Sequence, residues 1–164
     1  PIEVAQAKVI FGSRVFHLLD ATHVASEFFR VAAPGAHLVI GRVRSEPGSI
    51  KSQMARRMRE LMREEGLQSR AGKKAEKELV EICLAQGAKL LPDHHIVSWQ
   101  VSQSPAHSLA SWRGKEGLGG TNPPANQKAR ILAKLETWAR AEFGSLEEQI
   151  CADESYQLTH LALP

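Results

Sequence analysis

The stretch that decides the fold is KVIFGSRVFHLLDATHVASEFFRVAAPGAHLVI, residues 8–40. Its first apolar run, residues 8–12, predicts a short parallel strand that is buried on both faces. Apolar side chains then recur at helical spacing over residues 21–33, with Asp20 or Thr22 as the N-cap and Pro34-Gly35 as the stop. A second apolar run predicts a strand at residues 37–43. Strand, helix and strand in this order predict a βαβ crossover.

The rest of the chain predicts a continuation of the same α/β pattern. Residues 114–126 are rich in Gly, Pro and Asn and predict a loop, and Pro92-Asp93 predicts a turn before a strand. The expected order is β-α-β-α-α-β-α-α-β, with the last strand antiparallel. The further elements that we expect are helices at 50–65, at 75–86, from Ser104-Pro105 through Trp112 and at 125–143, and strands at 94–103 and 156–163.

Length and composition indicate an ordinary globular protein. The 164 residues predict a single domain, 1–164, in which residues 45–75 form a helical insertion or cap. Hydrophobic residues make up 43% and charged residues 24%, and the net charge is only +3. No apolar run approaches the roughly 18 residues of a membrane span, and no leader opens the chain, so we expect a cytoplasmic protein. Two distant cysteines, Cys83 and Cys151, predict neither a disulfide nor a metal site.

Two motifs carry a resemblance to a known family. The first motif is Phe16-His17-Leu18-Leu19-Asp20, and the second is Arg30-Val31-Ala32-Ala33-Pro34-Gly35. Their order resembles that found in class I S-adenosylmethionine-dependent methyltransferases of the small-molecule type 11 kind. In that family the first motif follows the fourth strand, and the second ends the next helix. The final strand of this chain resembles the family's antiparallel seventh strand, which inserts beside the fifth. The resemblance covers residues 1 to about 43 and implies a partial Rossmann-like sheet made of the fourth to seventh strands.

The resemblance also implies a reaction and an incomplete site. Family members transfer a methyl group from S-adenosylmethionine to a nucleophilic oxygen, nitrogen or carbon of a small molecule. Their glycine-rich turn, the acidic residue for the ribose and the strand flanking adenine precede the point that matches residue 1. The resemblance therefore implies the C-terminal, substrate-side half of an enzyme, incomplete and inactive alone. Its expected partners are a small-molecule acceptor and either the missing N-terminal half or a second copy.

The first expected strand ends in candidate site residues, because ligands of open α/β sheets bind beyond the carboxyl ends of the strands. By resemblance, Gly12, Ser13 and Arg14 would contact the cofactor, and Phe16 and His17 the substrate. His17 would also be the catalytic base, since a histidine titrates near neutrality. The alternatives are an ordinary βα turn, a structural histidine and an arginine that faces solvent.

The helix at 50–65 has a basic face and an apolar face that carries Met54 and Met58. We expect a cap whose thioethers contact the substrate, together with Trp112 in a later helix. The alternatives are a core-packing helix with a solvated basic face, and a surface for membranes or other anionic partners, including nucleic acid. Aromatic residues are only 5% of the chain, which disfavours a nucleic-acid partner.

Two further features bear on metals and on partners. His94 and His95 are neighbours on an expected strand and point to opposite faces, so they do not predict a metal site. The apolar strand at 8–12 would lie at a sheet edge, which supports a second hypothesis: a non-catalytic module that dimerises or complements another chain through this edge.

Overall fold

The computed structural model describes residues 3–68 and 72–164, and the chain divides into two compact units. The sheet unit comprises Pro1–Arg44, Ala71–Ser98 and Ser155–Pro164. The helical unit comprises Ser45–Arg70 and Trp99–Glu154. Of the helical insertion or cap expected at 45–75, residues 45–70 thus belong to a larger unit that also contains the later helices, and residues 71–75 belong to the sheet unit. The expectation of a single domain stays a prediction.

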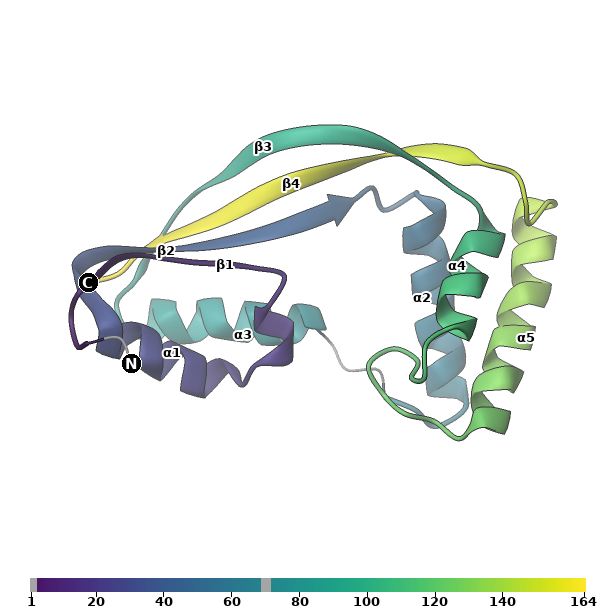
Figure 1. The fold of residues 1–164 in the computed structure, drawn as a ribbon, viewed down its shortest axis with the longest axis horizontal. Coiled ribbons are helices and arrows are strands. Elements are labelled where there is room, and N and C mark those ends of the chain that lie inside the picture. Colours follow the sequence, from purple (N-terminus) through teal and green to yellow (C-terminus); the bar gives the residue numbers. More distant parts are fainter. Residues whose placement is uncertain (1–2, 69–71) are drawn as a thin grey trace. The chain divides into compact units, whose positions relative to one another are not determined.

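The strands form one four-stranded sheet with the order β1-β2-β4-β3 (Figure 1). β1 pairs in parallel with β2, with Gly12 opposite Ile40. β4 runs antiparallel to β2, because Leu163 N donates to Ala36 O while Glu46 N donates to Asp153 O. The predicted α/β class with an antiparallel last strand is therefore confirmed. The strands are β1 (Ala7–Ser13), β2 (Ala32–Ser45), β3 (Lys89–Gln103) and β4 (Ile150–Ala162).

Helices α1 (Ala21–Val31) and α3 (Gly72–Ala85) cover one face of the sheet in the sheet unit (Figure 1). Alternate β2 residues bury their side chains on this face, as the period of a strand requires. The core there includes Phe16, Ala21, Ala25, Ala36, Leu38, Ile40, Leu79, Cys83, Ala88, Leu161 and Leu163. Burial in this core raises the pKa of the Cys83 thiol, as expected for an inert core cysteine.

The opposite face of β1 is open. Val9 and Phe11 are each 60% exposed, whereas Ile10 between them packs against the core. The prediction that this strand is buried on both faces was therefore wrong. Val9 and Phe11 are exposed because, among the described residues of the sheet unit, helices pack on one face of the sheet only.

α1 follows the single 3-10 turn η1 (Phe16–Leu18) and has Asp20 as its N-cap. The Asp20 carboxylate accepts a hydrogen bond from His23 N at 2.9 Å, which satisfies one free amide of the first turn. The helix ends at Val31 rather than at residue 33, and Pro34-Gly35 lies within β2. Since Ala32 already pairs with Ala7 of β1, sheet pairing ends the helix before the proline does.

Helices α2 (Ile50–Glu64), α4 (Pro105–Arg113) and α5 (Ala125–Phe143) build the helical unit. Serine caps two of them: Ser49 accepts from Ser52 N, and Ser104 accepts from His107 N. The three helices enclose one core, which contains Ile50, Met54, Met58, Leu61, Met62, Leu109, Leu118, Ile131, Leu132, Leu135, Ala139 and Leu146.

Two strands are longer than expected. β3 begins at Lys89 and runs through Pro92 and Asp93, so the turn predicted there was wrong. β3 is an edge strand, and one side of its backbone has no neighbouring strand to pair with. A proline whose nitrogen faces that side costs the sheet no hydrogen bond. β4 begins at Ile150 instead of residue 156. No helix in the described part of the chain combines the length and the apolar character needed to cross a membrane.

Candidate functional site

The carboxyl end of β1 carries three of the expected cofactor residues, at the end of the sheet where α/β proteins bind ligands. Ser13 lies opposite Gly41 of β2, and Arg14 follows with φ 57, in the left-handed region. Arg14 N donates to Gly41 O at 3.3 Å, which ties the turn to β2. The Arg14 side chain is exposed.

Gly12 serves a packing role that the sequence did not reveal. A Cβ atom at Gly12 would overlap the Phe16 ring, with Cε2 only 2.6 Å away. Phe16 is 7% exposed and makes an edge-to-face contact with Phe28, with ring centroids 5.8 Å apart. The space at Gly12 therefore holds a core ring. Phe16, expected to contact substrate, lies in the core of the sheet unit.

Tyr156 of β4 contacts the end of β1, which the sequence pattern does not predict. Its hydroxyl donates to Ser13 Oγ at 2.7 Å. A Cβ atom at Gly41 would overlap that hydroxyl, so glycine at this position makes room for the pair. The one sequence signal was a glycine inside an apolar strand, which often marks a close approach of another group. Ser13, Gly41 and Tyr156 form a small polar group that we call the Ser13 cluster.

His17 was the expected catalytic residue. Its backbone lies in η1, but its side chain falls outside the described part of the structure. Its role as a base and as a substrate contact stays a prediction.

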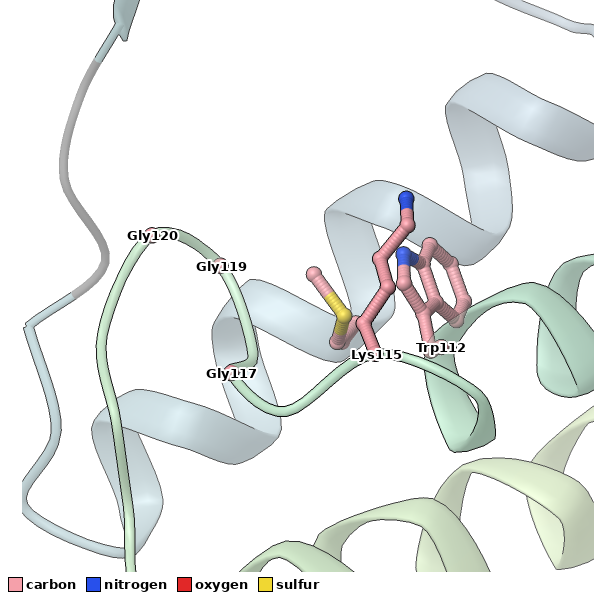
Figure 2. A pocket seen from close by; sticks show the side chains of 6 residues that line it. Trp112, Lys115, Gly117, Gly119 and Gly120 are labelled. Carbon is pink, nitrogen blue, oxygen red and sulfur yellow. The ribbon is translucent and has the colours of Figure 1, made fainter. Parts of the chain in front are cut away.

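A pocket of about 340 Å³ lies within the helical unit (Figure 2). It brings together two of the expected substrate residues, Met58 of α2 and Trp112 of α4. The third, Met54, is fully buried in the core and does not line it. Lys115 was not expected, although it closely follows the tryptophan in the sequence. The complete lining is Met58, Trp112, Lys115, Gly117, Gly119 and Gly120.

The glycines of this pocket lie in an ordered turn. Leu118 and Thr121 exchange backbone hydrogen bonds of 2.9 and 3.0 Å. Gly119 and Gly120 between them have φ values of 58 and 80, the positive pair that a type I′ turn requires. Leu118 is buried in the helical core and anchors the turn. This part of the loop expected at 114–126 is thus a fixed wall of the pocket.

Three histidines lie close together on the sheet. His160 Nε2 and His37 Nδ1 are 2.8 Å apart, and the His94 and His160 ring centroids are 5.9 Å apart. Burial, with smaller contributions from His37 and His94, lowers the pKa of His160 below its usual range. His95 instead contacts Ser98 Oγ at 3.0 Å. Within the described ranges, no three His, Cys, Asp or Glu side chains are placed to share a metal ion.

The basic helix α2 agrees with one of the alternatives given for it, a core-packing helix with a solvated basic face. Its apolar side chains are buried in the helical unit, so they are not available to a membrane surface. Arg57 on its polar side pairs with Glu60 at 3.1 Å and with Glu64 at 3.4 Å. Pairs of this kind partly neutralise the basic face.

Comparison with known proteins gives a likeness of fold. No protein-family model and no curated protein matches the chain. A solved candidate type II methyltransferase from Anaeromyxobacter dehalogenans is 16% identical, with a TM-score of 0.52, over 98% of this chain and 66% of that one. A candidate methyltransferase from Bacillus halodurans C-125 is 13% identical, with a TM-score of 0.50, over 100% of this chain and 67% of that one.

A more distant match is the Streptomyces coelicolor A3(2) geranyl diphosphate C-methyltransferase, crystallised with Mg²⁺, geranyl diphosphate and S-adenosyl-L-homocysteine. It is 10% identical with a TM-score of 0.40, over 100% of this chain and 51% of that one. The chain thus spans about two thirds of the first two structures. Its fold resembles the Rossmann-like fold of these two structures, and its antiparallel strand β4 lies beside β2.

Proposed function

We propose that this chain is the substrate-side half of a methyltransferase that moves a methyl group from S-adenosylmethionine to a small molecule. The single observation that carries the proposal is the sheet order β1-β2-β4-β3, in which β4 lies between β2 and β3 and runs antiparallel to β2. This is the arrangement that the family resemblance implies for the fourth, fifth, seventh and sixth strands. The two solved structures with the same fold are both described as methyltransferases.

The Ser13 cluster is the proposed cofactor contact in this chain. Ser13 Oγ accepts from Tyr156, which leaves the Ser13 hydroxyl proton for an acceptor such as a carboxylate. Arg14, the next residue in the sequence, has an exposed side chain, and its guanidinium suits the carboxylate at the methionine end of the cofactor. Gly12 does not contribute an open cradle, because Phe16 fills its space. The Ser13 hydroxyl and the Arg14 side chain support the proposal that this chain contacts one end of the cofactor.

The cofactor would supply an electrophilic methyl group on a sulfonium ion. The protein then has to hold the acceptor nucleophile in line with that methyl group and exclude water. His17 remains the proposed base for acceptors that lose a proton. The pocket beside Trp112 is the proposed acceptor site.

The open face of β1 is the proposed contact for the missing half of the enzyme. Val9 and Phe11 expose apolar surface there, and β1 is an edge strand with unpaired backbone groups. A preceding part of a longer protein would extend the sheet from β1 and cover this face. The structures with the same fold are longer than this chain, which agrees with the proposal.

The test is S-adenosylhomocysteine binding and methyl transfer in the longest natural form of the protein. We expect micromolar binding by calorimetry, and a loss of turnover of about tenfold or more in Ser13→Ala and in His17→Ala. Ser98→Ala on β3 is the matched control, since Ser98 contacts only His95 among the described side chains. Unchanged turnover in both site variants would remove the site assignment. Absence of cofactor binding would overturn the proposed function.

The exposed edge also favours a second candidate function, a module that binds a second copy through β1. Sedimentation of the chain at rising concentration tests it. A dimer that Phe11→Lys disperses would support this function, because a charge on an edge strand opposes pairing. A monomer at all concentrations would count against it.

A further inference from the structure

The pocket in the helical unit combines an apolar floor with an unpaired cation. We propose that it binds a small organic anion, a carboxylate or phosphate carried on an apolar body, through Trp112, Met58 and Lys115. The identification of this anion as the methyl acceptor rests on the proposed function. The preference of the pocket for an anion does not depend on it.

The apolar part of the pocket comes from two elements. Met58 reaches it from α2 and is 5% exposed, and the partly buried Trp112 reaches it from the end of α4. Figure 2 shows the indole of Trp112 among the side chains that line the pocket. Thioethers adapt to irregular apolar ligands, and an indole gives a flat apolar surface. About 340 Å³ suits a ligand of one or two rings, or a short branched chain, at the small end of natural sites.

The polar part of the pocket consists of donors. Lys115 and Trp112 both line the pocket, and Figure 2 shows their side chains, which carry an ammonium group and an indole N–H. Across residues 3–68 and 72–164, Lys115 makes no ion pair and Trp112 donates no side-chain hydrogen bond into its surroundings. No carboxylate is among the lining residues. Two donors without an acceptor favour an anionic oxygen group.

Two neighbouring cations already have partners, and the carboxylates of Glu116 and Glu136 line a second pocket that also includes Lys115. Arg113 pairs with Glu136, and Lys128 Nζ donates to the backbone oxygens of Arg113 and Lys115. These contacts hold the chain end of α4 against α5 and fix the start of the Lys115 segment. Lys115 is therefore left as the cation that faces the pocket.

The turn at 118–121 makes the opposite wall rigid. Gly117 cannot carry a side chain without displacing its neighbours, because a Cβ atom there would lie 2.6 Å from Thr121 O and 2.8 Å from Asn122 Oδ1. Gly119 and Gly120 add no side chains to block the mouth. A rigid wall loses little entropy when a ligand binds, which favours a preformed site.

The test uses the chain labelled with ¹³C at the methionine methyl groups. Its three methionines, Met54, Met58 and Met62, all lie in α2, but only Met58 lines the pocket. We titrate 4-phenylbutyrate, 4-phenylbutyl phosphate and the neutral 4-phenylbutyramide. The Met58 signal should shift in a saturable way, Met54 and Met62 should move little, and both anions should bind more tightly than the amide. The better of the two anions then distinguishes a carboxylate site from a phosphate site.

Substitutions separate charge from apolar contact. Lys115→Gln should weaken the anions about tenfold, as expected for the loss of one charge-assisted hydrogen bond at an exposed site, and should leave the amide unchanged. Lys77→Gln in the sheet unit is the matched control. Trp112→Leu should weaken all three probes. Three results would each overturn the proposal. They are equal affinity for the anions and the amide, no effect of Lys115→Gln on anion binding, and equal shifts of all three methionine signals.

The outcome is distinguishable from the proposed function. Met58 shifts without any binding of S-adenosylhomocysteine would leave an anion site in a protein that is not a methyltransferase. Cofactor binding and turnover without Met58 shifts would leave the enzyme and remove the anion site.

Discussion

The sheet unit and the helical unit bury their side chains in different ways. In the sheet unit, helices cover one face of the sheet, and Val9 and Phe11 remain exposed on the other side of β1. In the helical unit, α2, α4 and α5 enclose a core on their shared side, and every buried methionine of the chain lies there. The sheet unit thus leaves apolar side chains of β1 exposed, whereas the helical unit buries most of its large apolar side chains in its own core. This difference is the reason why the proposed partner is assigned to the sheet unit.

The largest expected effect comes from opening a cavity in either core. Leu38→Ala in the sheet unit and Leu135→Ala in the helical unit each remove a side chain that is 0% exposed. Each should lower the free energy of unfolding by about 2–5 kcal/mol, measured by denaturant titration. Hydrogen exchange should rise chiefly in the unit that carries the substitution.

Leu38→Met and Leu135→Met are the volume-matched controls and should cost less than about 1.5 kcal/mol each. If each alanine variant raised exchange equally in both units, the division into two compact units would not describe their stability.

A smaller effect compares two glycines at the end of the sheet. Gly12→Ala would press a methyl group into the buried Phe16 ring, and overpacking of this kind costs about 1–3 kcal/mol. Gly41→Ala would instead meet the Tyr156 hydroxyl, the far end of a partly buried side chain that can rotate away. It should cost less than Gly12→Ala in thermal unfolding, although it breaks the hydrogen bond to Ser13. The reverse order would show that the Ser13 cluster is the more rigid of the two contacts.

These two glycines also show what the sequence could and could not predict. Apolar periodicity placed every helix and strand in the right order, because period 2 and period 3.6 are local properties of the chain. Gly12 was read as room for a ligand, yet its neighbour in space is Phe16, and no local pattern specifies that contact. Tyr156 was missed because 143 residues separate it from Ser13. Lys115 was missed because a lone lysine in a glycine-rich loop has no local signature.

A buried carboxylate gives the next effect. Glu154 of the helical unit is 7% exposed and accepts from Lys51 Nζ at 2.6 Å and from Ser45 Oγ at 2.7 Å. Burial would raise the pKa of Glu154, but these hydrogen bonds outweigh it and hold the pKa below its usual value. Glu154→Gln should lower the free energy of unfolding by about 1 kcal/mol at pH 7, since Lys51 is half exposed and loses a charged partner.

The sign of the pH effect provides the check. A lowered carboxyl pKa stabilises the fold above the unfolded value of 4.5, and that contribution is lost as the pH falls through the folded pKa. The difference between wild type and Glu154→Gln should therefore shrink in denaturant titrations below pH 4.5. A difference that stayed constant at low pH would mean that packing, and not charge, is responsible.

The smallest effect belongs to the histidines of the sheet unit and acts near neutral pH. The pKa of His160 is lowered by burial and by His37 and His94, so the folded state binds its proton less readily than the unfolded chain does. The free energy of unfolding therefore keeps its full value above the unfolded pKa of 6.5. It declines as the pH falls through that value toward the folded pKa of His160. Thermal unfolding between pH 7.5 and 5.5 should show this decline. His160→Gln should reduce it, whereas His23→Gln, on the exposed side of α1, should not. The apolar face of β1 lies on the same sheet as these histidines. A partner that bound there and excluded more water from the histidines would make stability decline more steeply with falling pH. If dimerisation or complementation left this slope unchanged, the interface would lie elsewhere on the sheet unit.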